Sequence, residues 1–269
     1  MRYVAVISYF GANYVGWQRQ LNGLSVQETL EKAMSKAFGE EVSATASGRT
    51  DAGVHALAQV VHFDVNTSIP TDKIPFAVNS CLPSDISMLS CEVAPDDFNA
   101  RFSAKKKTYC YKLYLSRHPR PMLESTHEHI VVPLDLNVMR EGASVIEGEH
   151  DFKCFEATGS VIKNTVRTVY GVDIKVSPLE RIDGVFGEGV CDKDDGVDGR
   201  IFDCTVEISV TGNGFLYNMV RIIAGTLVYM GMGKLTTDDL KIALATCDRT
   251  LVGKTLPPHG LHLLSVKYN

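Results

Sequence analysis

The chain of 269 residues lacks several features that mark whole classes of protein. Its seven cysteines are scattered and include no Cys-x-x-Cys pair, so neither a metal site nor a disulfide framework is predicted, and reduced thiols in a cytosol fit this pattern better. No segment reaches eighteen clean apolar residues. The nearest, 219–232, contains Arg221 and glycines, so no membrane span is predicted. The N-terminus has too short an apolar run for a signal peptide and is expected to form a strand.

An excess of positive charge is also missing. The formal net charge is −5, so any RNA-binding face must be a local patch. The hydrophobic fraction of 45% and the charged fraction of 22% are ordinary for a globular protein and allow a sizeable core. The length allows one large domain or two of ordinary size.

One stretch, 47–56, reads Ser-Gly-Arg-Thr-Asp-Ala-Gly-Val-His-Ala and lies between two strand-like runs. It is predicted to form a loop at the end of a hairpin-like unit, in which the glycines permit sharp turns. Asp51 stands at its centre, and the nearby cation of Arg49 favours the ionised carboxylate. An Asp in a glycine-rich turn more often caps backbone N–H groups. Local chemistry therefore leaves both a catalytic and a structural role open.

Residues 99–120 form the one basic block and contain no Asp or Glu. Tyr109, Tyr111 and Tyr114 are interleaved with the cations. Cations that bind phosphates, interleaved with aromatic rings that stack on bases, are typical of a segment that contacts RNA. The alternative is a solvent-exposed strand whose lysine side chains lie along its surface. The basic residues are Arg101, Lys105, Lys106, Lys107, Lys112, Arg117 and Arg120.

Periodicity predicts two related α+β units, 1–104 and 105–269. In the first, a capping box at Ser25 starts a helix that ends near Gly39. The other predicted helices are 71–82, 136–146, 217–232 and 238–245. The predicted strands are 2–10, the two runs that flank 47–56, 86–93, 107–115, 167–176, 201–211 and 261–268.

The string Gly-Arg-Thr-Asp-Ala-Gly-Val-His-Ala at 48–56 resembles the active-site motif of the tRNA pseudouridine synthase A family. Further stretches resemble the family's other motifs, in the family's order and over nearly the whole chain. They are Gly-x-x-Tyr-x-Gly-Trp-Gln at 11–18, the segment 102–111, Asn-Gly-Phe-Leu-Tyr-Asn-Met-Val-Arg at 213–221 and Pro-Pro-His-Gly-Leu-His-Leu at 257–263. Asn99 departs from the family, which usually has His there.

The resemblance implies a fold of two ferredoxin-like α+β halves joined in one central, mainly antiparallel sheet. It implies a cytoplasmic homodimer that grips tRNA and converts uridines 38, 39 and 40 of the anticodon arm to pseudouridine. This reaction exchanges one bond to the sugar for another within a single nucleotide. It therefore requires neither a redox carrier nor a metal, and no cofactor is expected.

The resemblance also implies roles for particular residues. Asp51 is the catalytic residue, as nucleophile or base, and Arg49 and Arg221 orient it and hold it charged. Tyr109 and Leu263 sandwich the target base. The implied tRNA contacts are Arg101, Lys105, Lys106 and Lys107.

Two other functions stay open at this point. A hydrolytic ribonucleosidase is favoured by paired carboxylates, but the motif offers one. A non-catalytic RNA-binding module remains possible too. The segment 178–200 resembles an insertion, and its seven acidic and three basic residues give −7 + 3 = −4. Because an acidic loop repels phosphates, it is expected to be exposed and to point away from tRNA, the alternative being a partner-binding or gating element.

Overall fold

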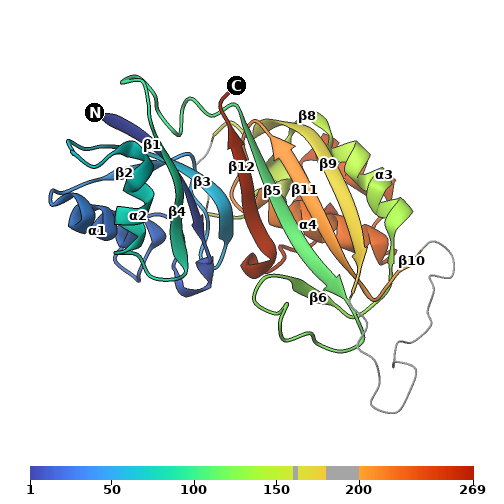
Figure 1. Ribbon diagram of the computed structural model, residues 1–269. Helices are drawn as coiled ribbons and strands as arrows, with labels where there is room; N and C mark the ends of the chain where they lie inside the picture. Colours follow the sequence, from blue (N-terminus) through green and yellow to red (C-terminus); the bar gives the residue numbers. More distant parts are fainter. Residues whose placement is uncertain (160–162, 180–199) are drawn as a thin grey trace, which may run out of the picture. The chain divides into compact units, whose positions relative to one another are not determined.

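A computed structural model describes residues 1–159, 163–179 and 200–269 (Figure 1). The fold class is α+β, as predicted, and most strand pairs are antiparallel. The chain divides into two compact units, one formed by Met1–Tyr109 with Leu261–Asn269 and the other by Cys110–Gly260. Apart from residues 178, 179 and 200, the predicted insertion lies outside the described residues.

In the first unit the strands follow the order β4, β1, β3, β12, and β2 also pairs with β3. The alternating burial of β1 places Tyr3, Ala5, Ile7 and Tyr9 in the core. β1 is antiparallel to both β3 and β4, whereas β12 runs parallel to β3. The strands are β1 (Arg2–Tyr9), β2 (Ala44–Ala46), β3 (His55–Asp64), β4 (Ile86–Val93) and β12 (Leu261–Lys267).

Helices α1 (Val26–Phe38) and α2 (Ile74–Asn79) pack against each other beside these strands (Figure 1). Of the predicted capping box at Ser25, the structure shows the N-cap half, in which the Ser25 side chain accepts a hydrogen bond from the Glu28 N–H, while the Glu28 carboxylate accepts from Lys32 Nζ. The helix ends at Gly39, whose φ of +76° is the left-handed conformation that glycine favours. The predicted helix 71–82 is shorter than expected: α2 follows a 3₁₀ turn, η2 (Thr71–Lys73). A second 3₁₀ turn, η1 (Gly11–Asn13), follows β1.

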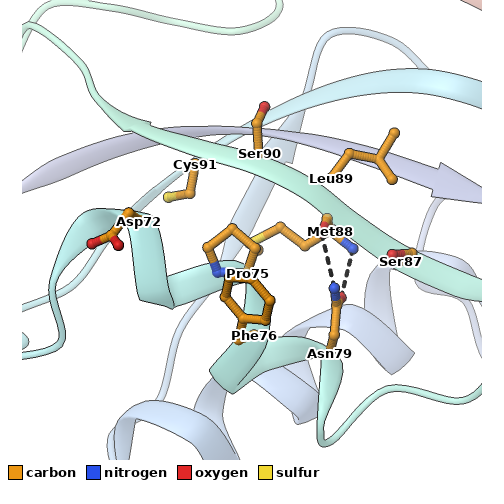
Figure 2. Close-up of a pocket in the computed structure, with 9 residues that line it drawn as sticks. All are labelled: Asp72, Pro75, Phe76, Asn79, Ser87, Met88, Leu89, Ser90 and Cys91. Carbon is orange, nitrogen blue, oxygen red and sulfur yellow. Dashed lines mark hydrogen bonds between the residues drawn. The ribbon is translucent and has the colours of Figure 1, made fainter.

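A shallow hollow of about 440 Å³ lies between α2 and β4 (Figure 2). The Asn79 side chain closes one side, where its amide donates to the Met88 carbonyl and accepts from the Met88 N–H. None of its lining residues belongs to the site predicted from the sequence. The hollow is therefore not the predicted active site.

In the second unit the main strands follow the order β5, β11, β9, β8. β6 pairs in parallel with the end of β5. The strands are β5 (Lys106–Leu115, of which the first four residues belong to the first unit), β6 (Glu128–Ile130), β8 (Gly148–Asp151), β9 (Val166–Pro178) and β11 (Cys204–Gly212). A separate short pair joins β7 (Leu134–Asp135) to β10 (Arg200–Ile201). The prediction of one strand over 201–211 is wrong at Phe202–Asp203, because Asp203 adopts a φ of +47° and separates β10 from β11.

Helix α4 (Met219–Gly231) is buried along nearly its whole length, which confirms the predicted buried helix. It packs on α3 (Leu136–Ile146), which in turn contacts β9 and α5 (Thr237–Thr246) (Figure 1). At Gly142 of α3 a Cβ would lie 2.5 Å from the sulfur of Met230 on α4, so a larger residue there requires the Met230 side chain to move. Shorter 3₁₀ turns complete the unit: η3 (Phe152–Phe155), η5 (Arg249–Leu251) and η6 (Pro258–Gly260).

Candidate active site

The predicted loop with Asp51 at its centre joins β2 to β3, and these strands are antiparallel neighbours. The hairpin prediction for 47–56 is therefore confirmed. The loop turns sharply after Asp51, where the Val54 N–H donates to the Asp51 carbonyl and Gly53 has a φ of +78°. Asp51 is partly accessible to solvent, and Arg49 is exposed on the same loop. The carboxylate thus stands at an accessible turn between two strands of a folded unit.

Buried hydrogen bonds hold the start of this loop. The Ser47 hydroxyl donates to Gln59 Oε1 at 2.6 Å, and Gln59 Nε2 donates to the Gly48 carbonyl at 2.9 Å. The Ser47 carbonyl accepts from Lys107 Nζ at 2.6 Å. Ser47 and Gln59 are fully buried. Because buried hydrogen bonds of this kind are costly to break, the backbone leading to Asp51 is fixed.

The residue before Asp51 is held from two other elements. The hydroxyls of Tyr9 and Thr50 share a hydrogen bond of 2.7 Å, and the Trp17 N–H donates to the Thr50 carbonyl at 3.0 Å. Burial raises the pKa of Tyr9 to about 12, so this phenol keeps its proton at neutral pH. The Trp17 ring is itself buried, 6.0 Å from the Tyr9 ring. The sole tryptophan therefore packs in the core and holds the loop through its backbone.

The segment after β1 supports the far side of the loop. The Gly53 N–H donates to the Tyr14 carbonyl at 3.3 Å, and the Gly11 N–H donates to Nδ1 of His55 at 3.0 Å. An imidazole that accepts at Nδ1 carries its proton on Nε2 and is neutral. The buried His55 ring is stacked between Phe10 at 4.6 Å and His262 at 4.8 Å. His55 of the motif therefore supports the loop through its packing against Phe10 and His262 and its hydrogen bond with Gly11.

Tyr109 of β5 is a buried tyrosine whose pKa responds to the charge of Asp51. Burial raises the pKa of the Tyr109 phenol well above its usual range, and the nearby Tyr9 and Asp51 side chains raise it further. The side chain is only 8% exposed. Tyr109 and Asp51 thus belong to the same unit, and the Tyr109 phenol is protonated at neutral pH.

Leu263 is placed by the parallel pairing of β12 with β3, in which it is the partner of Ala56. Ala56 follows the loop directly, so Leu263 lies beside the end of the Asp51 loop. Its side chain is buried. The first unit therefore contains Asp51, Arg49, Tyr109 and Leu263.

Arg221 belongs to the second unit, in the first turn of α4. Its Nε donates to the Leu256 carbonyl at 2.7 Å, and Nη1 donates to the Asn218 side chain. Asn218 precedes the helix in the left-handed conformation, with a φ of +60°. These bonds orient the half-buried guanidinium within its own unit and join α4 to the segment before η6.

The basic block separates into exposed and inward-facing cations. Arg101, Lys105 and Lys106 are exposed, whereas Lys107 is half-buried and its amine donates to the loop. The Asn99 side chain accepts from the N–H groups of Arg101 and Phe102 at 3.0 and 3.1 Å. The residue that departs from the family motif therefore caps the turn that presents Arg101.

Sequence reasoning missed Gln59 and Tyr9, which hold the loop without belonging to its motif. A glutamine inside an apolar strand was the available signal for Gln59. Tyr9 ends a strand with a regular alternation and gave no signal of its own. In the described part of the chain, no group of three or more potential ligands is arranged to hold a metal ion. None of the described helices has the length and apolar character needed to cross a membrane.

Comparison with known proteins gives a consistent set of relatives. A family profile described as tRNA pseudouridine synthase matches residues 5–103 and 143–269. Proteins named tRNA pseudouridine synthase A are similar to this chain. The one from Ruminiclostridium cellulolyticum is 43% identical over 262 residues, 97% of each chain. That from Thermoanaerobacter sp. strain X514 is 42% identical over 98% of each chain. That from Bacillus subtilis is 40% identical over the full length of both.

Proposed function

The chain belongs to the tRNA pseudouridine synthase family, and from that membership we propose that it isomerises uridines 38, 39 and 40 in the anticodon arm of tRNA. It is an isomerase, in keeping with the family. The observation that carries the proposal is the partly accessible Asp51 on a loop held by buried hydrogen bonds, with the Tyr109 phenol within reach of its charge. The enzyme acts as a homodimer in the cytosol.

The reaction sets clear demands on the site. The N1–C1′ bond of the nucleotide breaks, the uracil turns, and a C5–C1′ bond forms. The hydrogen on C5 leaves as a proton, and N1 gains a proton. A base inside a stem is out of reach, so it must be turned out of the helix. The site therefore needs a group that acts on the sugar or the base, and surfaces that keep the uracil bound while it turns.

Asp51 meets the first demand by one of three routes: it attacks C1′, it adds to C6, or it removes a sugar proton. A carboxylate on a fixed loop loses little entropy in reaching its target. The family resemblance assigns to Arg49 and Arg221 the orientation of this carboxylate. Tyr109 and Leu263 meet the second demand by packing on the two faces of the uracil.

The tRNA backbone is bound by the basic block. Arg101, Lys105 and Lys106 are exposed on the segment that leads into β5. Their cations neutralise phosphates, whereas Lys107 of the same block donates to the Ser47 carbonyl. The exposed Phe102 lies under the Arg101 guanidinium at 5.5 Å. Because this patch is local, it is compatible with the overall charge of −5.

Tritium release from transcripts labelled at uridine C5 tests the proposed function. Release is expected from anticodon arms with uridine at 38, 39 or 40, and replacement of all three by cytidine should abolish it. The mass of the RNA is expected to stay unchanged, whereas a hydrolase removes uracil and lowers the mass. Undiminished release from the triple-cytidine transcript contradicts the assignment of positions. Binding without release contradicts catalysis.

Replacement of Tyr109 tests the stacking role. Tyr109→Leu removes the aromatic face, and we expect kcat/KM to fall by a factor corresponding to about 1–3 kcal/mol, the usual cost of one base stack. Tyr114→Leu is the comparison, since Tyr114 is also buried in β5 but stacks on His129 at 4.5 Å. Activities are measured below the melting temperature of each variant. Equal activities at equal stability argue against Tyr109.

A further inference from the structure

Lys107 and Tyr109 are two residues apart on β5, so their side chains project from the same face of the strand. Tyr109 lies near Asp51, and Lys107 reaches the start of the same loop. One short piece of strand therefore bonds to the Asp51 loop through the Lys107 amine and carries, on the same face, the phenol on which the Asp51 charge acts.

The contact of Lys107 with the loop is closely fitted. Its Nζ donates to the Ser47 carbonyl at 2.6 Å. A Cβ on Gly48 would lie 2.8 Å from that nitrogen, so the glycine leaves room for the amine. The Ser47 N–H donates to the Val60 carbonyl at 2.8 Å, and the Gly48 carbonyl is occupied by Gln59. Lys107 thus completes a set of hydrogen bonds around the Ser47–Gly48 peptide.

This arrangement differs from that of a lysine that binds phosphate. Burial lowers the pKa of Lys107 to about 8, and the nearby charge of Arg101 adds to the decrease. Partial burial of a cation is unfavourable for stability, and an amine that already donates to the Ser47 carbonyl is less free to bind a solvated RNA backbone. A lysine amine has N–H donors in both its protonated and its neutral form. The hydrogen bond from Lys107 to the Ser47 carbonyl therefore does not require the amine to be charged.

We propose that Lys107 is a positioning residue that sets the spacing between β5 and the Asp51 loop, so that Tyr109 and Asp51 reach a flipped uracil together. This inference rests on the proposed function and adds to it a residue that does not contact the substrate. The geometry of a catalytic group must be held closely, because a displacement of about 1 Å costs about 100-fold in rate. A hydrogen bond from the same strand that carries Tyr109 supplies that restraint.

Lys107→Met removes the amine and keeps an unbranched side chain. We expect kcat at saturating tRNA to fall by about 10- to 100-fold, with the tRNA Kd and its salt dependence unchanged. Lys36→Met is the matched control, since Lys36 is exposed on α1 in the same unit, and it should keep the native kcat. Lys106→Met serves as the reference for a phosphate contact and should reduce the salt slope of binding by about one.

Amide hydrogen exchange of residues 47–54 gives a readout that does not need activity. Exchange in this loop should be faster in Lys107→Met and unchanged in Lys36→Met. Should Lys107→Met not fold, Lys107→Arg takes its place, because its larger head group crowds Gly48 and should also lower kcat. Native kcat with native exchange overturns the positioning role, as does a reduced salt slope with native kcat. If the native chain itself releases no tritium, the proposed function fails, and loop exchange alone decides the role of Lys107.

Discussion

Asp51→Asn is expected to abolish pseudouridine formation while the protein still folds and binds tRNA. The change keeps the size of the side chain but removes the charge, so the residue no longer acts as a nucleophile or base. Hydrogen bonds made by Ser47, Gly48 and Thr50 hold the loop, and the substitution leaves these groups in place. Loss of a group at the reacting centre commonly costs about 10⁴-fold or more in kcat.

Tritium release under single-turnover conditions measures this loss, and a filter-binding assay measures tRNA affinity. Asp72→Asn is the matched control, because Asp72 is exposed on η2 and lies outside the motif. The control should retain native turnover and a native melting temperature. Substantial turnover by a folded Asp51→Asn protein contradicts the assignment of Asp51 as the catalytic residue.

The parts of the fold that could be predicted are those governed by local rules. The Ser25 cap, the amphipathic α1 and the hairpin around Asp51 follow from side-chain hydrogen bonding and from periods of 3.6 and 2 residues. The buried α4 was evident from its apolar composition. The break at Asp203 was missed because alternation continues on both sides of it, and a single left-handed residue leaves little trace in the pattern.

The packing of the site could not be predicted in the same way. The parallel pairing of β12 with β3, which places Leu263 beside Ala56, joins segments far apart in the sequence and has no local signal. The basic block marked Lys107 as one cation among several, because composition does not show on which face of a strand a side chain lies. Only the structure shows that its amine contacts the Ser47 carbonyl. Residues that hold a loop from neighbouring strands are thus the hardest to find by sequence.

Gly16→Ala is expected to reduce both stability and turnover, because Gly16 lies against the peptide that carries Asp51. Its φ is +102°, and a Cβ there would lie 2.6 Å from the Thr50 carbonyl oxygen and 3.1 Å from the Asp51 carbonyl carbon. The unfavourable φ costs about 1–3 kcal/mol and the overpacking a similar amount. The neighbouring bond from the Trp17 N–H to the Thr50 carbonyl must shift to make room. That shift moves Asp51.

Gly39→Ala separates the two contributions. Gly39 has a φ of +76°, but a Cβ there meets no atom within 4 Å, so this variant carries the backbone strain without the clash. Urea unfolding should show a smaller loss of stability for Gly39→Ala, of about 1 kcal/mol, with native turnover. Gly16→Ala, assayed where it is fully folded, should lose about 100-fold or more in kcat, because the carboxylate is displaced. If the two folded variants turn over tRNA equally, then Gly16 does not position Asp51, and the contact between its segment and the loop serves stability alone.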